Sequence, residues 1–380
     1  MPKHVLEPIY LRNDAEAYMA NPYFGPEFMG LGPYRLVKWE PGSYMEFSRF
    51  DDYYRGRPPL DRVILRFISD FNTLVSVALA GSVDVADLAG NVEAVLTMKR
   101  RLEGTGHQVR TDPTDNVRHI EIQHRPEAAR PRFALTDRTV RAALYHAIDR
   151  KAFTEATVEG LSPIADSWFR PDDPLRKDVE NWIPQFPYDP ARGQQLLAQT
   201  SWARGPDGTL VHRDTGERFE LEMWAKPGTN TERELEIIAD FWKAVGVAGK
   251  VIPLTAARAN DRELLAQHPG VTTSSPTYTD LFGVLRLHSS QVASPANRWS
   301  GRNSGGYANP AADALQDRLA LTIDKDQRIE LHRQLLQEMM GDVALMPLDW
   351  EIHSVFYTRS VKGEVTGFER GWNVYEWDKE

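Results

Sequence analysis

The chain has 380 residues, 41% hydrophobic and 26% charged, a composition typical of globular proteins that excludes a fibrous or wholly disordered chain. Its 54 acidic and 45 basic residues give a formal net charge of -9, without the basic surplus that nucleic-acid-binding proteins normally carry. The absence of cysteine excludes disulfides, zinc–thiolate sites, iron–sulfur ligation and thiol nucleophiles.

No segment of the sequence has the character of a membrane span or a leader. The first residues lack both an apolar core region and a small-residue cleavage site, so they do not form a secretory signal as they stand. The most apolar stretch, Phe67 to Ala80, is interrupted by Asp70, Asn72 and Ser76. It is also shorter than the roughly 18 apolar residues that a membrane span needs.

The first third of the chain alternates strands with short helices. Apolar and polar residues alternate at 34–39, 44–50, 60–68 and 83–86, which predicts strands. Asp70 is a predicted N-cap, and Gly81 ends the helix that begins there.

Helical spacing prevails further along the chain. Apolar residues recur at helical intervals after Asp137, Asp189 and Asp324, each a predicted N-cap, and again over about 229–245. A strand is expected at 219–224, and more strands close the chain. Residues 160–190 are rich in proline and aromatic residues without periodicity, which indicates an ordered irregular loop. The whole pattern indicates an α/β or mixed α+β protein with two lobes.

The motifs of common enzyme classes are missing. The sequence has no G-x-S-x-G, H-E-x-x-H or P-loop pattern, and Gly30-Leu31-Gly32 lacks the third glycine of a dinucleotide fingerprint. His119 and His124 lie five apart on a predicted strand, so they point to opposite faces and cannot share a metal. We therefore expect no catalytic residue, no metal site and no cofactor.

Aromatic residues are abundant: 10 Trp, 13 Tyr and 15 Phe. Most should lie in the core. Trp and Tyr are also favoured where a wet cleft must offer apolar surface, which suits a ligand-binding protein.

Several motifs occur in one order along nearly the whole chain. They are P-K-H at 2–4, G-P-Y-R-L at 32–36, W-E-P-G at 39–42, D-Y-Y-R-G-R-P-P-L-D at 52–61, A-G-S-V-D-V-A at 80–86, D-R-T-V-R-A-A-L with A-I-D-R within 137–150, and Y-D-P-A at 188–191. In this order they resemble the bacterial extracellular solute-binding proteins of family 5, the dipeptide, oligopeptide and nickel class.

The resemblance implies a two-lobed fold of the periplasmic-binding-protein type II kind, with a hinge. It also implies an N-terminally truncated member, because the P-K-H element lies mid-chain in that family. Lobe I would comprise residues 1–118 with 345–380, and the second large lobe 119–344. The implied partners are a peptide or small-molecule ligand and the ABC permease subunits of a membrane importer, with no nucleic acid. The implied location is the periplasm or the cell surface, as a lipoprotein.

One family loop differs here in a way that bears on the ligand. Peptide-binding members carry a W-x-x-D-Y-x-D-P-like segment whose first Asp holds the ligand's α-ammonium. Here Ser274 and Thr277 stand at the Trp and Asp positions, and only Tyr278 and Asp280 fit. Burying a cationic amine without a carboxylate is costly, so an oligosaccharide, a glycoside or another amphipathic solute is as suitable an expectation as a peptide.

The candidate ligand-binding residues follow from that loop and its surroundings. They are Tyr278, Asp280, Trp299, Arg302, Asn303, Trp350 and Trp224. For each, core packing or an ordered surface position is the alternative.

Other functions remain open at this point. The same fold could serve a non-transport ligand sensor, and a hydrolase is a less favoured alternative. Metal or haem as the ligand also stays open, since family members differ in ligand chemistry. A lobe lacking strands would expose sheet edges and apolar surface, which predicts poor solubility or dimerisation.

Overall fold

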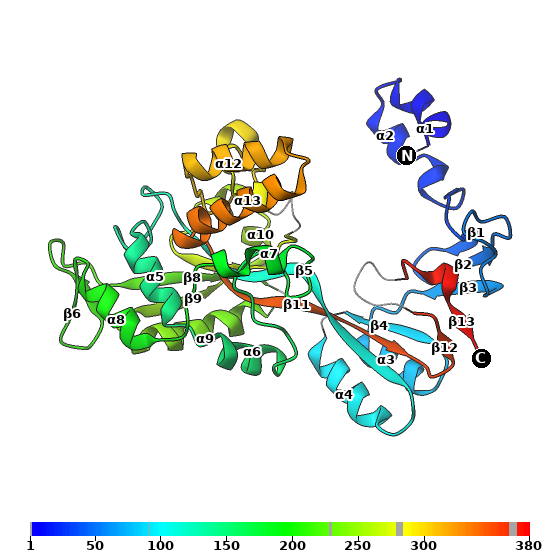
Figure 1. Ribbon diagram of the computed structural model, residues 1–380, viewed down its shortest axis with the longest axis horizontal. Coiled ribbons are helices and arrows are strands. Elements are labelled where there is room, and N and C mark those ends of the chain that lie inside the picture. The colour runs from blue at the N-terminus through cyan, green and yellow to red at the C-terminus, as the bar shows by residue number, and fades with distance from the viewer. Residues whose placement is uncertain (1, 90, 228–229, 279–283, 365–370) are drawn as a thin grey trace. The chain divides into compact units, whose positions relative to one another are not determined.

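The computed structural model describes residues 2–89, 91–227, 230–278, 284–364 and 371–380 (Figure 1). It divides into two compact units, Met1–Asp112 with His353–Glu380, and Pro113–Ile352. Two strands, β5 (Gln108–Ile122) and β11 (Met346–Tyr357), each run from one unit into the other. The second unit is therefore one unbroken stretch of chain, whereas the first is built from two stretches.

The first unit combines short helices with an antiparallel three-stranded sheet. Its elements, besides the ends of β5 and β11, are α1 (Lys3–Tyr10), α2 (Ala15–Met19), η1 (Pro22–Phe24), β1 (Tyr34–Glu40), β2 (Tyr44–Arg49), β3 (Arg62–Arg66), α3 (Phe71–Leu79), β4 (Val85–Ala89), α4 (Val92–Leu102), β12 (Val361–Lys362), η7 (Val374–Glu376) and β13 (Asp378–Lys379). Strands β1, β2 and β3 form the antiparallel sheet, and β4 pairs antiparallel with the end of β11.

Helix α3 shows how the local sequence determines an element of this unit. The Asp70 side chain accepts a hydrogen bond from the backbone N–H of Thr73, so it is the N-cap that the sequence predicts. Gly81 follows the helix with a φ of +68°, a left-handed conformation that glycine adopts without strain. Both predicted ends of the helix are confirmed.

Large apolar side chains on the surface of the first unit are numerous. Those exposed by more than half are Tyr10, Leu11, Met19, Met29, Leu31, Val37 and Tyr54.

The second unit is larger and mixes helices with strands. Besides its parts of β5 and β11, it contains α5 (Arg138–His146), α6 (Arg150–Val158), α7 (Arg176–Val179), η2 (Glu180–Trp182), α8 (Pro190–Ala198), β6 (Trp202–Arg204), β7 (Leu210–His212), β8 (Glu220–Ala225), α9 (Thr231–Ala244), β9 (Ala248–Pro253), α10 (Ala256–Ala259), α11 (Arg262–Ala266), β10 (Val271–Ser274), η3 (Val284–Leu287), η4 (Ser289–Gln291), η5 (Pro295–Asn297), α12 (Pro310–Leu321), α13 (Lys325–Leu335) and η6 (Leu336–Met340).

Local signals place several of these helices correctly. Asp137, Asp189 and Asp324 each accept a hydrogen bond from a backbone N–H in the first turn of α5, α8 and α13. All three are N-caps, as the sequence predicts. The helix expected over about 229–245 is α9, and the strand expected at 219–224 is β8.

The sheet of the second unit has the order β11-β5-β10-β8-β9. Strand β10 runs antiparallel to β5 and parallel to β8, which in turn runs parallel to β9. Helix α9 packs against β8 and β9. Since side chains alternate along each strand, the register decides which residues face the core and which face away from it.

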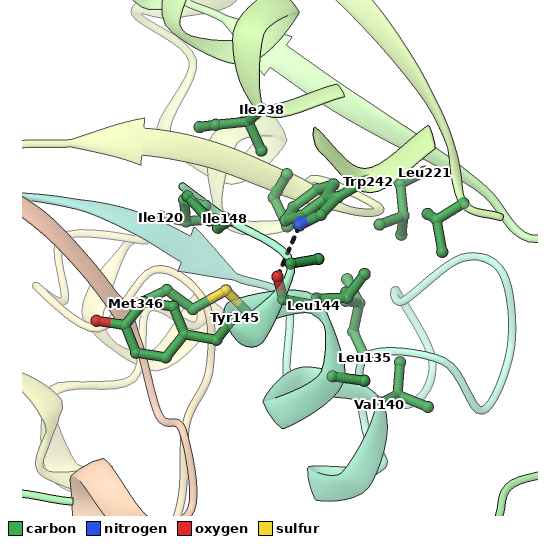
Figure 2. Packing of buried hydrophobic residues seen from close by; sticks show 14 of the residues in the cluster. Ile120, Leu135, Val140, Leu144, Tyr145, Ile148, Leu221, Ile238, Trp242 and Met346 are labelled. Atoms are coloured by element: carbon green, nitrogen blue, oxygen red, sulfur yellow. Dashed lines mark hydrogen bonds between the residues drawn. The ribbon is translucent and has the colours of Figure 1, made fainter. Parts of the chain in front are cut away.

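One side of this sheet faces the main hydrophobic core. Ile120, Leu221 and Ile238 are fully buried there, together with residues of α5 and α9 (Figure 2). The indole Nε1 of Trp242 donates a hydrogen bond of 3.0 Å to the carbonyl oxygen of Leu144, which fixes the ring of α9 against α5. Each of these large side chains contributes roughly 1.5–3 kcal/mol by its burial.

A second core lies under the helix pair α12 and α13, which pack against each other (Figure 1). Its members include Leu319, Leu335 and Met339 from this helical region, and Trp350 from β11. Both hydrophobic cores thus belong to the unbroken second unit.

Candidate functional site

The side of the sheet that faces away from the main core is polar. Thr272 of β10 pairs with Glu121 of β5, and Ser274 pairs with His119, so these four side chains share one face. Trp224 follows Met223, which pairs with Val271 in the core, and therefore lies on the polar face as well. Alternation along three strands thus brings an indole, a carboxylate, a hydroxyl and an imidazole together.

A pocket of about 370 Å³ opens on this face, within the second unit. Besides Glu121, Trp224 and Thr272, it is lined by Lys226, Arg262, Leu265, His268, Ala293, Trp299, Ser300, Gly301 and Ser304. The volume lies within the range of roughly 300–1,000 Å³ typical of small-molecule sites. Two indoles beside a few charged and polar groups give the pocket both apolar and polar character.

Trp224 is held from two directions. Its indole Nε1 donates a hydrogen bond of 3.1 Å to a carboxylate oxygen of Glu222. The guanidinium carbon of Arg258 lies 5.2 Å from the centre of the ring, a cation–π contact. These contacts keep the orientation of the indole fixed before any ligand arrives, which lowers the entropy cost of binding.

Trp299 lines the pocket from a tightly turned loop. Arg298 and Trp299 both have left-handed backbones, with φ of 52° and 58°, although neither is glycine. Such conformations cost about 1–3 kcal/mol each and persist only where the surrounding structure enforces them. Here the backbone N–H of Trp299 donates a hydrogen bond of 2.8 Å to the carbonyl oxygen of Ser294. The backbone N–H of Ser294 in turn donates a hydrogen bond of 3.0 Å to Oδ1 of Asn297.

Glu121 is an ionised carboxylate in the pocket wall. Burial opposes its ionisation, yet its pKa is lowered, because His268 in its protonated form, Arg286 and a hydrogen bond from the Ser304 hydroxyl stabilise the charged form. The hydroxyl of Ser304 donates to Oε1 of Glu121. A half-buried carboxylate with a lowered pKa indicates a positive local field.

His268 is a neutral imidazole that faces the pocket. It is only 2% exposed, and burial lowers its pKa to about 4. Neither ring nitrogen forms a hydrogen bond among the described residues, and the nearby Gly270 backbone does not reach hydrogen-bonding geometry. Both ring nitrogens are shielded from solvent, so His268 contributes to the pocket wall without offering them to a ligand.

A smaller pocket adjoins the first, since Glu121 and Ser304 line both. Arg286, Arg302 and His119 are among its other lining residues. Burial lowers the pKa of His119 to about 4, and its Nδ1 lies 3.1 Å from the carbonyl oxygen of Val117. The described lining residues of the two pockets include four cationic side chains (Lys226, Arg262, Arg286 and Arg302) and one carboxylate.

The residues expected from the sequence do not all meet in one place. Trp224 and Trp299 line the larger pocket, and Arg302 and Asn303 line the smaller one. Asp280 lies outside the described residues.

The buried members of the expected set have structural contacts. The side-chain amide of Asn303 donates a hydrogen bond of 2.8 Å to the backbone carbonyl of Tyr307. It also accepts a hydrogen bond of 3.0 Å from the backbone N–H of Tyr307, and the two bonds hold the turn between these residues. Tyr278, 3% exposed, packs edge-on against His119 with ring centres 5.9 Å apart, and Trp350, 1% exposed, sits in the second core. Tyr278 and Trp350 are not among the lining residues of either pocket, and a role in binding stays a prediction for all seven.

Of the residues that line the larger pocket, the sequence indicated only Trp224 and Trp299. The titratable residues that it missed are Glu121, Lys226, Arg262 and His268. The alternation His-Ile-Glu-Ile over 119–122 is a signal for a polar face, and Lys226 directly follows β8. Arg262 and His268 lie in short elements without a motif, so no local signal identifies them.

Two searches of the described part of the chain gave negative results. Among the residues that the structure describes, no three His, Asp or Glu side chains are grouped so that they could hold a metal ion. In the same ranges, no helix is long and apolar enough to cross a membrane.

Comparison with known proteins supplies the family. Residues 3–282 match the family model described as "Bacterial extracellular solute-binding proteins, family 5 Middle". The chain is 24% identical over 351 residues to the oligopeptide-binding protein AppA of Bacillus subtilis, covering 90% of this chain and 59% of that protein. It is 25% identical over 348 residues to heme-binding protein A of Haemophilus influenzae, covering 89% and 57%. The chain thus spans less than two thirds of the length of these relatives.

A solved structure confirms the fold class. NikZ from Campylobacter jejuni, in complex with Ni(L-His), superposes with a TM-score of 0.74 at 21% identity, covering 100% of this chain and 72% of that one. The mixed α/β, two-lobed fold expected from the sequence is therefore confirmed. The family consists of solute-binding proteins of extracellular location, and the model match covers well over half of the chain. The chain belongs to the bacterial extracellular solute-binding proteins, family 5.

Proposed function

We propose that this protein is the substrate-binding component of an ABC importer, which captures a small solute or peptide and delivers it to a membrane permease. The observation that carries the proposal is the pocket of about 370 Å³ lined by Trp224 and Trp299, in a chain of this family. The proposed location is the periplasm or the cell surface. No bond of the solute is broken, so the protein is not an enzyme.

The proposed mechanism is closure of two lobes around the solute. The support is that β5 and β11, two continuous strands, each run from one unit into the other, as the two connections of a hinge would. A solute that binds the closed state more tightly than the open one shifts the population toward it, and the permease would recognise that state.

The relatives indicate which solutes to test. Their names include an oligopeptide-binding and a heme-binding protein, and the NikZ complex contains Ni(L-His). A panel of oligopeptides, haem, nickel–histidine and oligosaccharides should be screened by thermal unfolding of the purified 380-residue chain. A ligand present at 100 times its Kd stabilises the folded state by about 2.7 kcal/mol, which gives a measurable rise in Tm.

Trp299→Ala is the test of the pocket itself. It removes an indole from the lining and should weaken binding of the ligand found in the screen by at least about tenfold. Trp372→Ala, at a partly exposed position of the first unit, is the matched control and should leave the affinity unchanged. A panel without any response, or equal affinities of the Trp299→Ala and unaltered chains, would contradict the proposal.

A further inference from the structure

We infer that the solute carries an anionic group, which Lys226 and Arg262 hold while its planar or apolar part lies against Trp224 and Trp299. The inference rests on the proposed function and names its ligand class.

The charge of the pocket is opposite to that of the protein. The chain as a whole has a formal net charge of -9. Lys226 and Arg262 line the larger pocket, and Arg286 and Arg302 line the smaller one. Within the part of the chain that the structure describes, Glu121 is the one carboxylate that lines them. A local surplus of cations on an acidic protein attracts anions to that place, because the walls of a concave site focus the field.

The carboxylate of the described pocket lining, Glu121, does not form an ion pair with the cationic side chains of that lining. Among the described residues, Glu121 forms no ion pair within 4.0 Å, and its hydrogen bond comes from the neutral Ser304. In the same part of the chain, Arg262 has no carboxylate partner within that distance. An arginine guanidinium is a strong, often bidentate donor to a carboxylate or phosphate, so Arg262 is suited to the ligand's anion.

The remaining lining accounts for the rest of the ligand. Trp224, held by Glu222 and Arg258, provides a fixed aromatic surface, and Trp299 provides a second one. His268 completes the pocket wall, with both of its ring nitrogens shielded from solvent. The class that fits is an aryl or acyl carboxylate, including a peptide with a free C-terminus and an aromatic side chain.

A cationic ligand is the main competitor. Glu121 could in principle receive an ammonium, but such a ligand would have to enter beside Lys226 and Arg262. Among the described lining residues, four cationic side chains stand against one carboxylate, which makes the anion the better match.

Three probes of nearly equal shape separate these classes. N-acetyl-Ala-Phe with a free carboxylate is anionic, its C-terminal amide is neutral, and Ala-Phe amide without the acetyl group is cationic. Calorimetric titration of the purified chain should show the anionic probe binding at least about tenfold more tightly than the neutral one. Raising the salt concentration should weaken the anionic probe selectively.

Substitutions then assign the effect to the residues. Arg262→Gln and Lys226→Gln should each lower the affinity for the anionic probe about 10- to 100-fold and leave the neutral probe nearly unchanged. Arg192→Gln, which removes an exposed cation of α8 away from the pocket, is the matched control.

The outcomes separate this inference from the proposed function. Preference for the neutral or cationic probe, equal loss for Arg192→Gln, or no binding of any of the three probes would overturn the anionic assignment. If the wider panel still yields a ligand in these cases, the proposed function stands. A panel without any ligand would overturn both.

Discussion

The stability of the second unit should depend on pH through one buried carboxyl group, that of Asp349. Its side chain is fully buried on β11, and neither oxygen has a hydrogen-bond partner among the described residues. The nearest cation is Arg118, whose Nε lies 3.5 Å from Oδ1. Arg118 also pairs with Glu234 and, at 3.1 Å, with Glu351, so three carboxylates share one guanidinium.

This environment disfavours the charged form of Asp349. Burial raises its pKa to about 7; Arg118 opposes the increase, while Glu234 and Glu351 add to it. The difference from the usual 3.8 corresponds to about 4 kcal/mol between the two protonation states. Between pH 3.8 and about 7 the folded chain holds a proton at Asp349 that the unfolded chain has lost. Stability from this group therefore falls as pH rises through that window.

Asp349→Asn removes the titration while keeping the size of the side chain. Relative to the unaltered protein, the variant should gain about 1.4 kcal/mol of unfolding free energy per pH unit between pH 4 and 7. The gain should reach about 4 kcal/mol in total near pH 8 and then level off. Urea unfolding followed by tryptophan fluorescence at several pH values measures this difference directly.

Comparing Asp349→Asn with the unaltered protein cancels the contribution of the other titrating groups to the pH dependence. A second variant isolates the effect of burial. Asp326→Asn removes the same formal charge from an exposed position in the first turn of α13. If the difference between Asp349→Asn and the unaltered protein stays constant within about 0.5 kcal/mol from pH 4 to 8, the reasoning is wrong, because a buried carboxyl that titrates near 7 requires a slope.

Two further substitutions test the packing that positions the pocket. Trp242→Phe removes the hydrogen bond to the Leu144 carbonyl and part of a fully buried ring. It should lower the free energy of unfolding, measured in urea, by about 2–4 kcal/mol. A loss below about 1 kcal/mol would contradict the packing described for this ring. Gly305→Ala would place its Cβ 2.2 Å from the carbonyl oxygen of Ile122, so the loop must move away from β5. We expect a loss of more than about 2 kcal/mol together with weaker ligand binding, measured by thermal unfolding and titration, and an unchanged affinity would argue against a link between this loop and the pocket.

Helix ends could be predicted from the sequence because their causes are local. Asp70, Asp137, Asp189 and Asp324 cap helices by bonding to backbone N–H groups two or three residues away. No information about the remainder of the chain is needed for that interaction. The order of family motifs likewise sufficed for the fold class.

The composition of the pocket depends on contacts far apart in the sequence. Glu121 meets Thr272 only because β5 and β10 pair in one particular register, and a slip of β10 by one residue would turn Thr272 to the other face, away from Glu121. His268 reaches the same place from a short loop before β10. Tryptophan shows the same limit: Trp224 and Trp299 face the pocket, whereas Trp350, of the same residue type, packs in a core.

The uninterrupted course of the second unit from Pro113 to Ile352 has a genetic consequence. Both hydrophobic cores and the walls of both pockets are encoded in one continuous interval, flanked on either side by the two segments of the first unit. A single recombination event between paralogous genes, with its end points in the codons of β5 and β11, would exchange the whole set of pocket residues at once. The exchanged interval would join the host segments at two places along the chain, in β5 and β11, so the pocket residues can change by replacement of the interval as well as by point mutation.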